Sequence, residues 1–280
     1  MRQIFIDNKI NDAFTQDGFV VIPGLLKTGE CHHLEKLFFS LLEEAQLDIP
    51  FFTTHWSSNS HYRRKVHEEV SSYLYPLLAG YFRNYKNIYG YYLTKMPGGN
   101  NRTVVHQDWA MVDESNYAGV TFWCPLVDVD MQNGCFRVIP GSHTYFNNYR
   151  GTNIKLPYAD WGNQLEEQCL VSLELKAGDA VFFDHRLVHA SPPNLSKKTR
   201  VAVGMVLIPD EAAVIHYLQK DGSILKYKAN DDFLQSFYYN YKEPSTGLFD
   251  TERLELAEIV TPIMESPVSK ELTLQKFSGQ

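Results

Sequence analysis

Short apolar runs alternate with turn-forming residues through the middle of the chain, between about residues 88 and 208. Such alternation, with Gly, Pro and Asn at the breaks, is typical of a domain built from many short strands. We predict strands at 88–93, 104–106, 119–127, 135–139, 171–175, 180–183 and 201–208. The breaks include Pro97-Gly98-Gly99-Asn100, Asn133-Gly134 and Pro192-Pro193-Asn194. This region therefore predicts a sandwich or a jelly roll.

The flanking regions have a different pattern, because apolar residues there recur at helical spacing. We predict helices at 9–18, 28–45 and 66–81, the last interrupted near Pro76, with a strand at 19–22 and a loop at 50–63. Residues 144–168 form a longer polar and aromatic insertion, which we interpret as an active-site lid. The simplest organisation is a single domain over residues 1–280, with a helical N-terminal part (1–87), a β core (88–208) and a helical C-terminal cover (209–280).

Composition and charge exclude several function classes. A net charge of -7 is unfavourable for binding a phosphate backbone, so no nucleic-acid partner is expected. The 4 cysteines include no Cys-x-x-Cys pair, which argues against a structural zinc site and a disulfide framework. No apolar run approaches the ~20 residues that span a bilayer, and the N-terminus lacks an apolar signal core. We therefore expect a cytoplasmic protein that acts on a small molecule and has no membrane partner; its oligomeric state stays open.

The candidate chemistry centres on His106-Gln107-Asp108. Residues two apart in an extended strand point to the same face, so His106 and Asp108 can grip one cation while Gln107 points elsewhere. Two histidines and one carboxylate on one side of an octahedron leave positions for a co-substrate and for dioxygen, as in non-haem iron(II) oxygenases. Because a histidine near a carboxylate is also common without any metal, the prediction requires a third ligand.

The third ligand is sought at His185 or His189. Arg200 lies eleven residues after His189, at the start of an apolar strand, where an unpaired buried charge is costly. A guanidinium binds a carboxylate through two parallel hydrogen bonds, so an oxo-diacid chelated to iron would supply a partner for Arg200. We therefore favour His189 as the ligand and interpret His185 as structural or as a neighbour of the site. An internal salt bridge is the alternative interpretation of Arg200.

Several segments match a family pattern in order and in spacing. They are Asp17-Gly18-Phe19-Val20-Val21-Ile22-Pro23-Gly24, Val105-His106-Gln107-Asp108, Trp123-Cys124-Pro125-Leu126, the stretch from Asn133 to His143, Gly178-Asp179 before a Phe-Phe strand, His189-Ala190-Ser191, and Arg200. Over roughly residues 10–210 the chain resembles the phytanoyl-CoA dioxygenase family of iron(II)/2-oxoglutarate oxygenases.

The resemblance implies a mainly β fold with flanking helices, a double-stranded β-helix of the cupin-like jelly-roll kind. It implies iron(II) bound by His106, Asp108 and His189, with 2-oxoglutarate and dioxygen as co-substrates and ascorbate as an optional reductant. It also implies 2-oxoglutarate contacts, for which the candidates are Arg200 and Ser191, then Trp123, Gln107 and Tyr91. Lys95 occupies a position where the family often has a basic residue, and residues 133–143 look like a structural hairpin.

The resemblance favours hydroxylation of an unactivated C–H bond, because halogenating relatives replace the metal carboxylate by a small residue and Asp108 is present. The acyl-CoA substrate of the founding enzyme does not carry over. We expect a small amphipathic metabolite, such as an amino acid or a natural product, in a pocket lined by residues 144–168, residues 50–63 and the neighbours of the metal. Candidate substrate contacts are Trp109, Arg137, Tyr149 and Trp161.

Alternatives stay open at this point. The two tryptophans suit simple packing, and Arg137 suits a structural ion pair. A cupin-like metalloenzyme that uses no oxoglutarate and a non-catalytic jelly-roll binding module are the competing functions. The same iron centre also supports desaturation, epoxidation and cyclisation.

Overall fold

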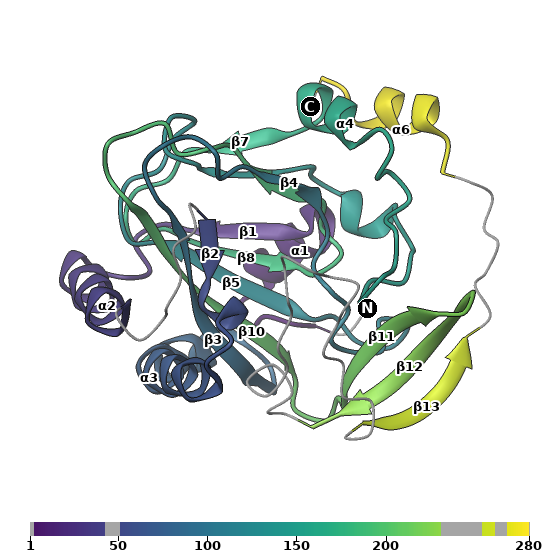
Figure 1. The fold of residues 1–280 in the computed structure, drawn as a ribbon, viewed down its shortest axis with the longest axis horizontal. Coiled ribbons are helices and arrows are strands. Elements are labelled where there is room, and N and C mark those ends of the chain that lie inside the picture. Colours follow the sequence, from purple (N-terminus) through teal and green to yellow (C-terminus); the bar gives the residue numbers. More distant parts are fainter. Residues whose placement is uncertain (1–2, 43–50, 231–253, 261–267, 280) are drawn as a thin grey trace.

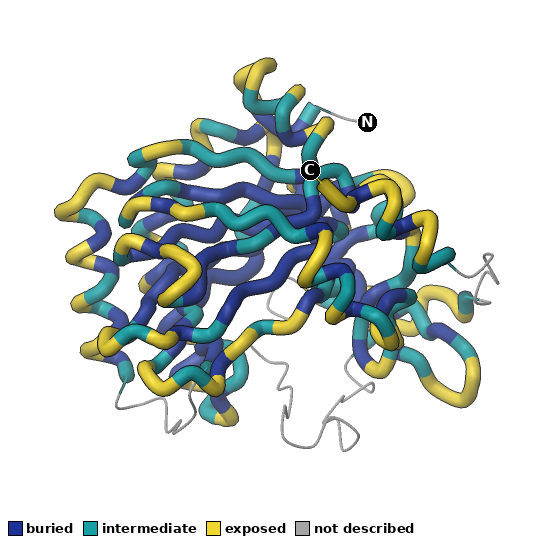
Figure 2. The backbone as a smooth tube through the Cα atoms, turned by 90° about the horizontal axis from the view of Figure 1, so that it is seen from above, coloured by how far each residue is buried: buried dark blue, intermediate teal, exposed yellow. Residues whose placement is uncertain are grey.

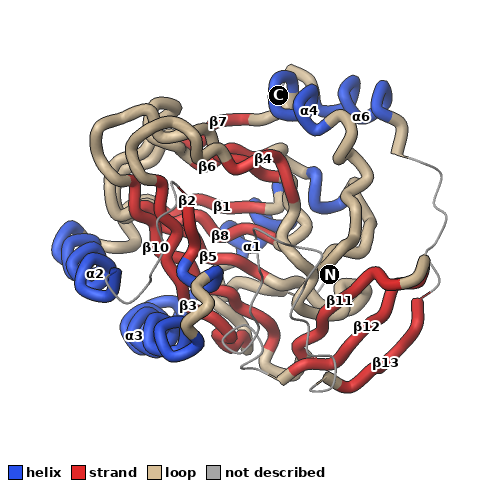
Figure 3. The backbone as a smooth tube through the Cα atoms, in the orientation of Figure 1, coloured by secondary structure: helices blue, strands red, loops and turns tan. Residues whose placement is uncertain are grey.

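Antiparallel sheets make up most of the fold (Figure 1), in a computed structural model that describes residues 3–42, 51–230, 254–260 and 268–279. The larger sheet contains, in spatial order, β1 (Phe19–Ile22), β8 (Ala180–Asp184), β5 (Val120–Pro125), β10 (Arg200–Pro209), β3 (Tyr85–Lys95) and β2 (Phe51–Thr53). The second sheet contains β4 (Thr103–His106), β9 (His189–Ser191), β6 (Phe136–Val138) and β7 (Val171–Leu173). These two sheets stack on one another without closing into a barrel among the described residues, and the prediction of a mainly β jelly-roll fold is confirmed (Figure 3).

The larger sheet is covered on both faces, which explains why β5 and β10 are near-continuous apolar runs. Every residue of these two strands is buried, and the buried segments run through the centre of the molecule in Figure 2. Alternate side chains leave opposite faces of a strand. Phe122 and Val203 therefore pack toward the helices, whereas Trp123 and Ala202 pack toward the second sheet.

The helices α1 (Asn8–Asp17), α2 (Thr28–Leu41) and α3 (Ser60–Leu78) confirm the helices predicted at 9–18, 28–45 and 66–81, with different bounds; residues 43–45 lie outside the described residues. The helix α3 begins six residues early because the Asn59 side chain accepts a hydrogen bond from the Tyr62 amide and caps it. Pro76 lies inside α3, so the predicted interruption is wrong.

The prediction of a loop at 50–63 is also wrong in part. The strand β2 pairs with the edge strand β3, and a short 3-10 turn, η2 (Thr54–Trp56), leads into α3. Two further 3-10 turns are η3 (Ala79–Tyr81) and η4 (Ser142–Thr144). A strand as short as β2 leaves no periodic pattern in the sequence, because its position depends on the neighbour that it pairs with.

The predicted helical C-terminal cover at 209–280 is wrong over most of its described length. The strands β11 (Val214–Lys220), β12 (Ser223–Ala229) and β13 (Glu255–Val260) form a third sheet, and only α6 (Lys270–Phe277) is helical. The first two strands form a hairpin through Asp221-Gly222, both with positive φ, of 50° and 78°. Asp-Gly between two apolar runs is a strong hairpin signal, which outweighs the mixed pattern around it.

The insertion 144–168 contains irregular chain followed by the short helix α4 (Gly162–Gln168). Its side chains Phe146, Tyr158 and Leu165 pack in one apolar cluster with Phe277 of α6. This packing fixes the insertion beside the second sheet. Among the described residues, no helix combines the length and the apolar character that crossing a membrane requires.

Candidate metal centre and adjoining cavities

Three side chains that are far apart in sequence meet at the second sheet. His106 ends β4 and lies opposite His189 of β9 in the antiparallel register, with ring centroids 4.1 Å apart. Asp108 Oδ1 lies 3.8 Å from His106 Nε2 and 3.7 Å from His189 Nε2. The strand β4 ends at His106, so Asp108 lies two residues beyond it. The two side chains still meet, as the two-residue spacing predicted, although the strand does not extend to Asp108. The three ligand atoms lie within 4.8 Å of one another, close enough to share one metal ion.

Backbone carbonyl groups fix the orientation of both imidazoles. His106 Nδ1 lies 2.9 Å from the carbonyl oxygen of Val104, and His189 Nδ1 lies 2.9 Å from that of Leu187. A carbonyl oxygen only accepts, so each Nδ1 carries the proton and each Nε2 presents its lone pair to the cluster. Burial lowers the pKa of His189 to about 4, with a further contribution from His106, which favours the neutral form that binds metals.

A hydrogen bond from Thr121 orients the carboxylate ligand. The Thr121 hydroxyl donates a hydrogen bond of 3.0 Å to Asp108 Oδ2, which leaves Oδ1 facing the imidazoles. Burial alone would raise the pKa of Asp108, but the neighbouring histidines and the Thr121 hydroxyl hold it below its usual value. The donor set of two imidazoles and one carboxylate therefore fits an Fe(II) ion.

A further residue that supports the cluster, Arg150, comes from the insertion and was not predicted from the sequence. Its guanidinium is 2% exposed, donates to the backbone carbonyl of Asp108 and pairs with Glu114. No sequence pattern links Arg150 to Asp108, because the contact depends on how the insertion folds back over the sheet. The insertion therefore supports a ligand from behind instead of covering the site.

One cavity, of about 300 Å³, extends from the His189 side of the cluster into the space between the two sheets. It is lined by four of the residues predicted to contact oxoglutarate, Arg200, Ser191, Trp123 and Tyr91. Apolar walls come from residues such as Phe136 and Phe183. A largely apolar cavity of this volume with a cation in its wall is suited to a small dicarboxylate.

The guanidinium of Arg200 has no acidic partner among the described residues. The side chain is 3% exposed, donates one long hydrogen bond of 3.4 Å to the carbonyl oxygen of Leu93, and lies 5.8 Å from the Trp123 ring centroid. Its Nε has no hydrogen-bond partner. Burial lowers the pKa of Arg200 to about 10. The described residues therefore contain no internal salt bridge to Arg200, which was the alternative interpretation of this residue.

A second buried basic side chain, Lys95, lies beside it. Lys95 is directly opposite Arg200 in the β3–β10 register, is 0% exposed, and donates to the backbone carbonyls of Ser191 and Pro192 at 3.0 and 2.6 Å. Burial and the charge of Arg200 lower the pKa of Lys95 to about 6. Lys95 thus holds the turn that carries Ser191, and this end of the cavity favours an anion.

Gln107 and Ser191 are both engaged with the protein itself. The Gln107 amide donates to the carbonyl oxygen of Arg186 at 2.7 Å and accepts from Tyr158 at 3.4 Å. The Ser191 hydroxyl donates to the carbonyl oxygen of Gly134 at 3.0 Å, which leaves its lone pairs at the cavity wall. Gln107 borders a different cavity, on the other side of Asp108.

That second cavity also has a volume of about 300 Å³. Its lining residues are His55, Trp56, Tyr89, Tyr91, His106, Gln107, Asp108, Trp109, Met111, Thr121, His185 and Val206. Five of these, including His55 and Tyr91, also line the first cavity, so the two cavities flank the metal cluster. The expectations that Trp109 and the segment 50–63 lie near the metal agree with this arrangement. His55 was missed, because the η2 turn has no sequence signature.

The other three candidate substrate residues lie away from the metal. Arg137 donates to the carbonyl oxygens of Glu166 and Leu170, both at 3.2 Å, which is a structural role. Trp161 packs near Tyr158, with ring centroids 6.3 Å apart. Neither residue lines either metal-flanking cavity, nor does any other residue of 144–168, so the described insertion is not a lid over them.

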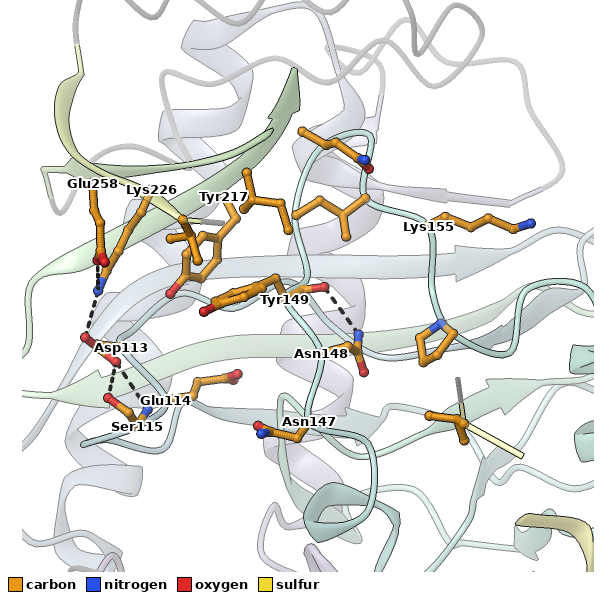
Figure 4. Close-up of a pocket in the computed structure, with 16 residues that line it drawn as sticks. Asp113, Glu114, Ser115, Asn147, Asn148, Tyr149, Lys155, Tyr217, Lys226 and Glu258 are labelled. Carbon is orange, nitrogen blue, oxygen red and sulfur yellow. Dashed lines mark hydrogen bonds and ion pairs between the residues drawn. The ribbon is translucent and has the colours of Figure 1, made fainter. Parts of the chain in front are cut away.

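Tyr149 lines a third cavity, of about 670 Å³, between the insertion and the C-terminal sheet (Figure 4). The charged residues in its wall are largely paired with one another. Lys226 bridges Asp113, at 2.8 Å, and Glu258, at 3.7 Å. This cavity does not include any residue of the metal cluster.

A jelly roll that holds two histidines and a carboxylate beside an uncompensated guanidinium defines a metal-dependent oxygenase of the oxoglutarate-using class. The comparisons with known proteins identify the family. A family model described as phytanoyl-CoA dioxygenase (PhyH) matches residues 14–202, more than half of the chain. The chain therefore belongs to the phytanoyl-CoA dioxygenase family, and the expectation of an iron- and 2-oxoglutarate-dependent dioxygenase is confirmed at the level of the class.

Individual relatives are distant. The chain is 28% identical over 244 residues to the phytanoyl-CoA dioxygenase domain-containing protein 1 homolog of Dictyostelium discoideum, which covers 82% of this chain and 78% of that protein. It is 30% identical over 126 residues to a phytanoyl-CoA dioxygenase of Arabidopsis thaliana, and that match spans 43% of each chain.

Two solved structures share the fold. One is SnoK, described as a non-heme alpha ketoglutarate dependent carbocyclase from nogalamycin biosynthesis, with a TM-score of 0.57, 24% identity, and coverage of 75% of this chain and 86% of that one. The other is HygX from Streptomyces hygroscopicus, solved with nickel and 2-oxoglutarate bound, with a TM-score of 0.54, 16% identity, and coverage of 74% and 88%.

Proposed function

We propose that this protein hydroxylates an unactivated C–H bond of a small metabolite, with iron held by His106, Asp108 and His189. 2-Oxoglutarate would lie in the cavity on the His189 side, with its far carboxylate on Arg200 and Ser191. The metabolite would lie in the cavity on the other side of Asp108. The reaction consumes one dioxygen and one 2-oxoglutarate for each alcohol formed and releases succinate and carbon dioxide, so its atoms balance.

The observation that carries this proposal is the guanidinium of Arg200, which has no acidic partner among the described residues and lines the same cavity as the metal cluster. Burying a cation without an acidic partner costs on the order of several kcal/mol, because the ion loses its hydration and relaxation of the protein recovers only part of the loss. A dicarboxylate of the right length would remove that cost through a bidentate pair. HygX, a solved structure of the same fold, has 2-oxoglutarate bound, which supports this choice of dicarboxylate.

The protein's own groups orient and shield the reactants. Thr121 and Arg150 hold Asp108 so that one carboxylate oxygen faces the imidazoles. Aromatic side chains form much of the walls of the two cavities beside the cluster. Bound iron would supply the activation of dioxygen, coupled to the oxidative decarboxylation of 2-oxoglutarate. Asp108 fills the carboxylate position, which favours transfer of a hydroxyl group.

Succinate release tests the proposal. Wild-type protein is incubated with Fe(II), ascorbate and 2-oxoglutarate, with and without a pool of small metabolites, and succinate is quantified. We expect succinate that depends on iron and rises with the metabolite pool. Asp108→Ala should abolish it through loss of metal, and Arg200→Ala should abolish oxoglutarate binding while metal binding is retained.

Each failure has a distinct meaning. Oxoglutarate turnover that survives in Arg200→Ala would reject the role given to Arg200. Wild-type protein that binds metal but never yields succinate would instead favour a cupin-like enzyme without oxoglutarate. Absence of both metal binding and succinate would favour a jelly-roll binding module.

A further inference from the structure

The cavity on the Asp108 side of the cluster, here called the substrate chamber, has an uncharged wall. Apart from the ligands His106 and Asp108, its described lining residues are aromatic, aliphatic or neutral polar, and none is Lys, Arg or Glu. The aromatic part comes from Trp56, Tyr89, Tyr91 and Trp109. An ionised substrate group placed here would lose its hydration without gaining a partner, which is very unfavourable.

The acids nearest to the chamber do not provide a free charge. Asp184 is held by Arg186 through two hydrogen bonds, of 2.8 and 2.6 Å, and Glu114 is paired with Arg150. Asp108 belongs to the metal cluster. Apart from the metal ligands, the described wall therefore offers no charged group that could pair with an ionised guest.

Two side chains in the described wall have polar atoms without a hydrogen-bond partner, the Tyr89 hydroxyl and the His185 ring. The side chains of Thr121 and Gln107 are already bonded, to Asp108 and to the backbone of Arg186. His185 is 1% exposed, and neither of its ring nitrogens has a hydrogen-bond partner. Leaving such a group unsatisfied costs about 1–3 kcal/mol, so an unsatisfied histidine in a cavity wall calls for a guest that completes it.

The backbone also holds His185 in place. Its amide donates to the carbonyl oxygen of Gly119 at 3.2 Å, and its ring lies directly over the Gly119 Cα, where any side chain would overlap with it. The ring is thus pre-positioned and cannot turn freely toward another partner. An imidazole always carries at least one N–H donor.

We propose that the substrate chamber takes an uncharged amphipathic molecule whose hydroxyl or carbonyl oxygen accepts a hydrogen bond from His185. This inference rests on the proposed function, whose substrate class it narrows. The cavity of about 300 Å³ suits a compact molecule packed between aromatic side chains. Free amino acids and acyl-CoA thioesters carry charges that the described wall does not match.

The test is a binding experiment on the full chain loaded with Zn(II), a diamagnetic metal that does not support turnover, in the presence of 2-oxoglutarate. The probes are a fragment set with equal numbers of neutral oxygen-bearing, anionic and cationic members. We expect the hits to be mainly neutral and to change the nitrogen-15 shifts of His185 in histidine-labelled protein.

Three variants define the role of His185. His185→Phe removes both ring nitrogens and should weaken the neutral hits at least tenfold. His185→Gln keeps a donor and should restore most of that loss. His143→Phe is the matched control, since His143 is an equally buried histidine that lines neither metal-flanking cavity, and it should leave fragment affinity unchanged. If His185→Phe does not fold, the nitrogen-15 shifts of His185 in the wild type and the fragment affinity of His185→Gln still test whether His185 contacts the bound fragment.

The inference is overturned if charged fragments predominate among the hits, if His185→Phe binds neutral hits as wild type does, or if no fragment binds at millimolar concentration. These outcomes are independent of succinate release. If the enzyme forms succinate but binds mainly charged fragments, the proposed function stands and only the inference of an uncharged substrate is rejected.

Discussion

The guanidinium of Arg150 donates a hydrogen bond of 2.7 Å to the backbone carbonyl of Asp108, 42 positions earlier in the chain. Arg150 in turn is anchored by Glu114 and by the carbonyl oxygen of Asn148, the latter at 3.0 Å. The insertion therefore acts on the metal cluster through the main chain of a ligand. A ligand that lies beyond the end of its strand needs such support, because the strand ladder no longer fixes its backbone.

We predict that Arg150→Met lowers metal affinity by about 10–100-fold, the usual effect of removing a group that orients a ligand. Metal affinity is measured by titration of the metal-free protein with Fe(II) under anaerobic conditions. Arg137→Met is the control, because Arg137 is also bonded to backbone carbonyls but supports residues 166 and 170 instead of a ligand. Equal losses in the two variants would contradict a specific role for Arg150.

Arg200 gives a prediction in which a binding residue destabilises the empty protein. Arg200→Met removes a buried, uncompensated charge, so we expect a higher Tm in the absence of 2-oxoglutarate. The same variant should lose the increase in Tm that 2-oxoglutarate gives to the wild type, because a ligand that binds only the folded state stabilises it by mass action. Differential scanning calorimetry with and without 2-oxoglutarate measures both effects.

A matched substitution separates the two contributions of Arg200. Trp123→Phe removes part of the ring that lies against the guanidinium but leaves the charge in place. We expect this variant to keep a response to 2-oxoglutarate. A fall in the Tm of ligand-free Arg200→Met would mean that the guanidinium is satisfied by groups other than a ligand.

The close approach of Gly119 and His185 predicts a strong coupling between the two positions. Gly119→Ala places a methyl group against the imidazole ring, so we expect it to destabilise the protein by about 1–3 kcal/mol, the range for overpacking. Shortening the ring in Gly119→Ala/His185→Ala should recover part of the loss. Urea unfolding of the single and double variants completes a double-mutant cycle, and purely additive effects would contradict the contact.

The sequence predicted the parts of the site that depend on local spacing. His106 and Asp108 follow from a two-residue repeat, and His189 with Arg200 follows from the need to place an acid-binding cation near a ligand. Their contacts stay within the two sheets that the apolar runs predict. The metal cluster of the structure contains these predicted ligands.

The rest depends on tertiary packing that one sequence does not encode locally. Arg150 and His55 reach the metal region from irregular segments, where no periodicity relates them to the sheet. Tyr149 and Trp161 were expected near the metal because their segment was interpreted as a lid, whereas its apolar side chains pack against α6 instead. The C-terminal sheet was missed although Asp221-Gly222 marks its hairpin.

His216 provides a test of pH dependence away from the metal ligands. It is fully buried, its Nε2 lies 2.9 Å from the Thr152 hydroxyl, and burial lowers its pKa to about 3. In the unfolded chain the pKa returns to about 6.5, so below that pH the unfolded state binds a proton that the folded state refuses. The stability associated with neutral His216 is therefore complete above about pH 6.5 and is lost progressively as the pH falls toward 3.

We predict that His216→Gln, which keeps a partner for Thr152 but cannot titrate, reduces the pH dependence of the unfolding free energy between pH 6 and 4. The reduction should approach one proton, about 1.4 kcal/mol per pH unit, where the unfolded histidine is fully protonated. Urea unfolding at several pH values measures the slope, and His32→Gln, at an exposed histidine, is the control that should leave it unchanged. Parallel pH profiles for His216→Gln and wild type would mean that His216 is protonated in the folded state. That result would contradict the prediction, which rests on the burial of the ring beside Trp109 and Thr152.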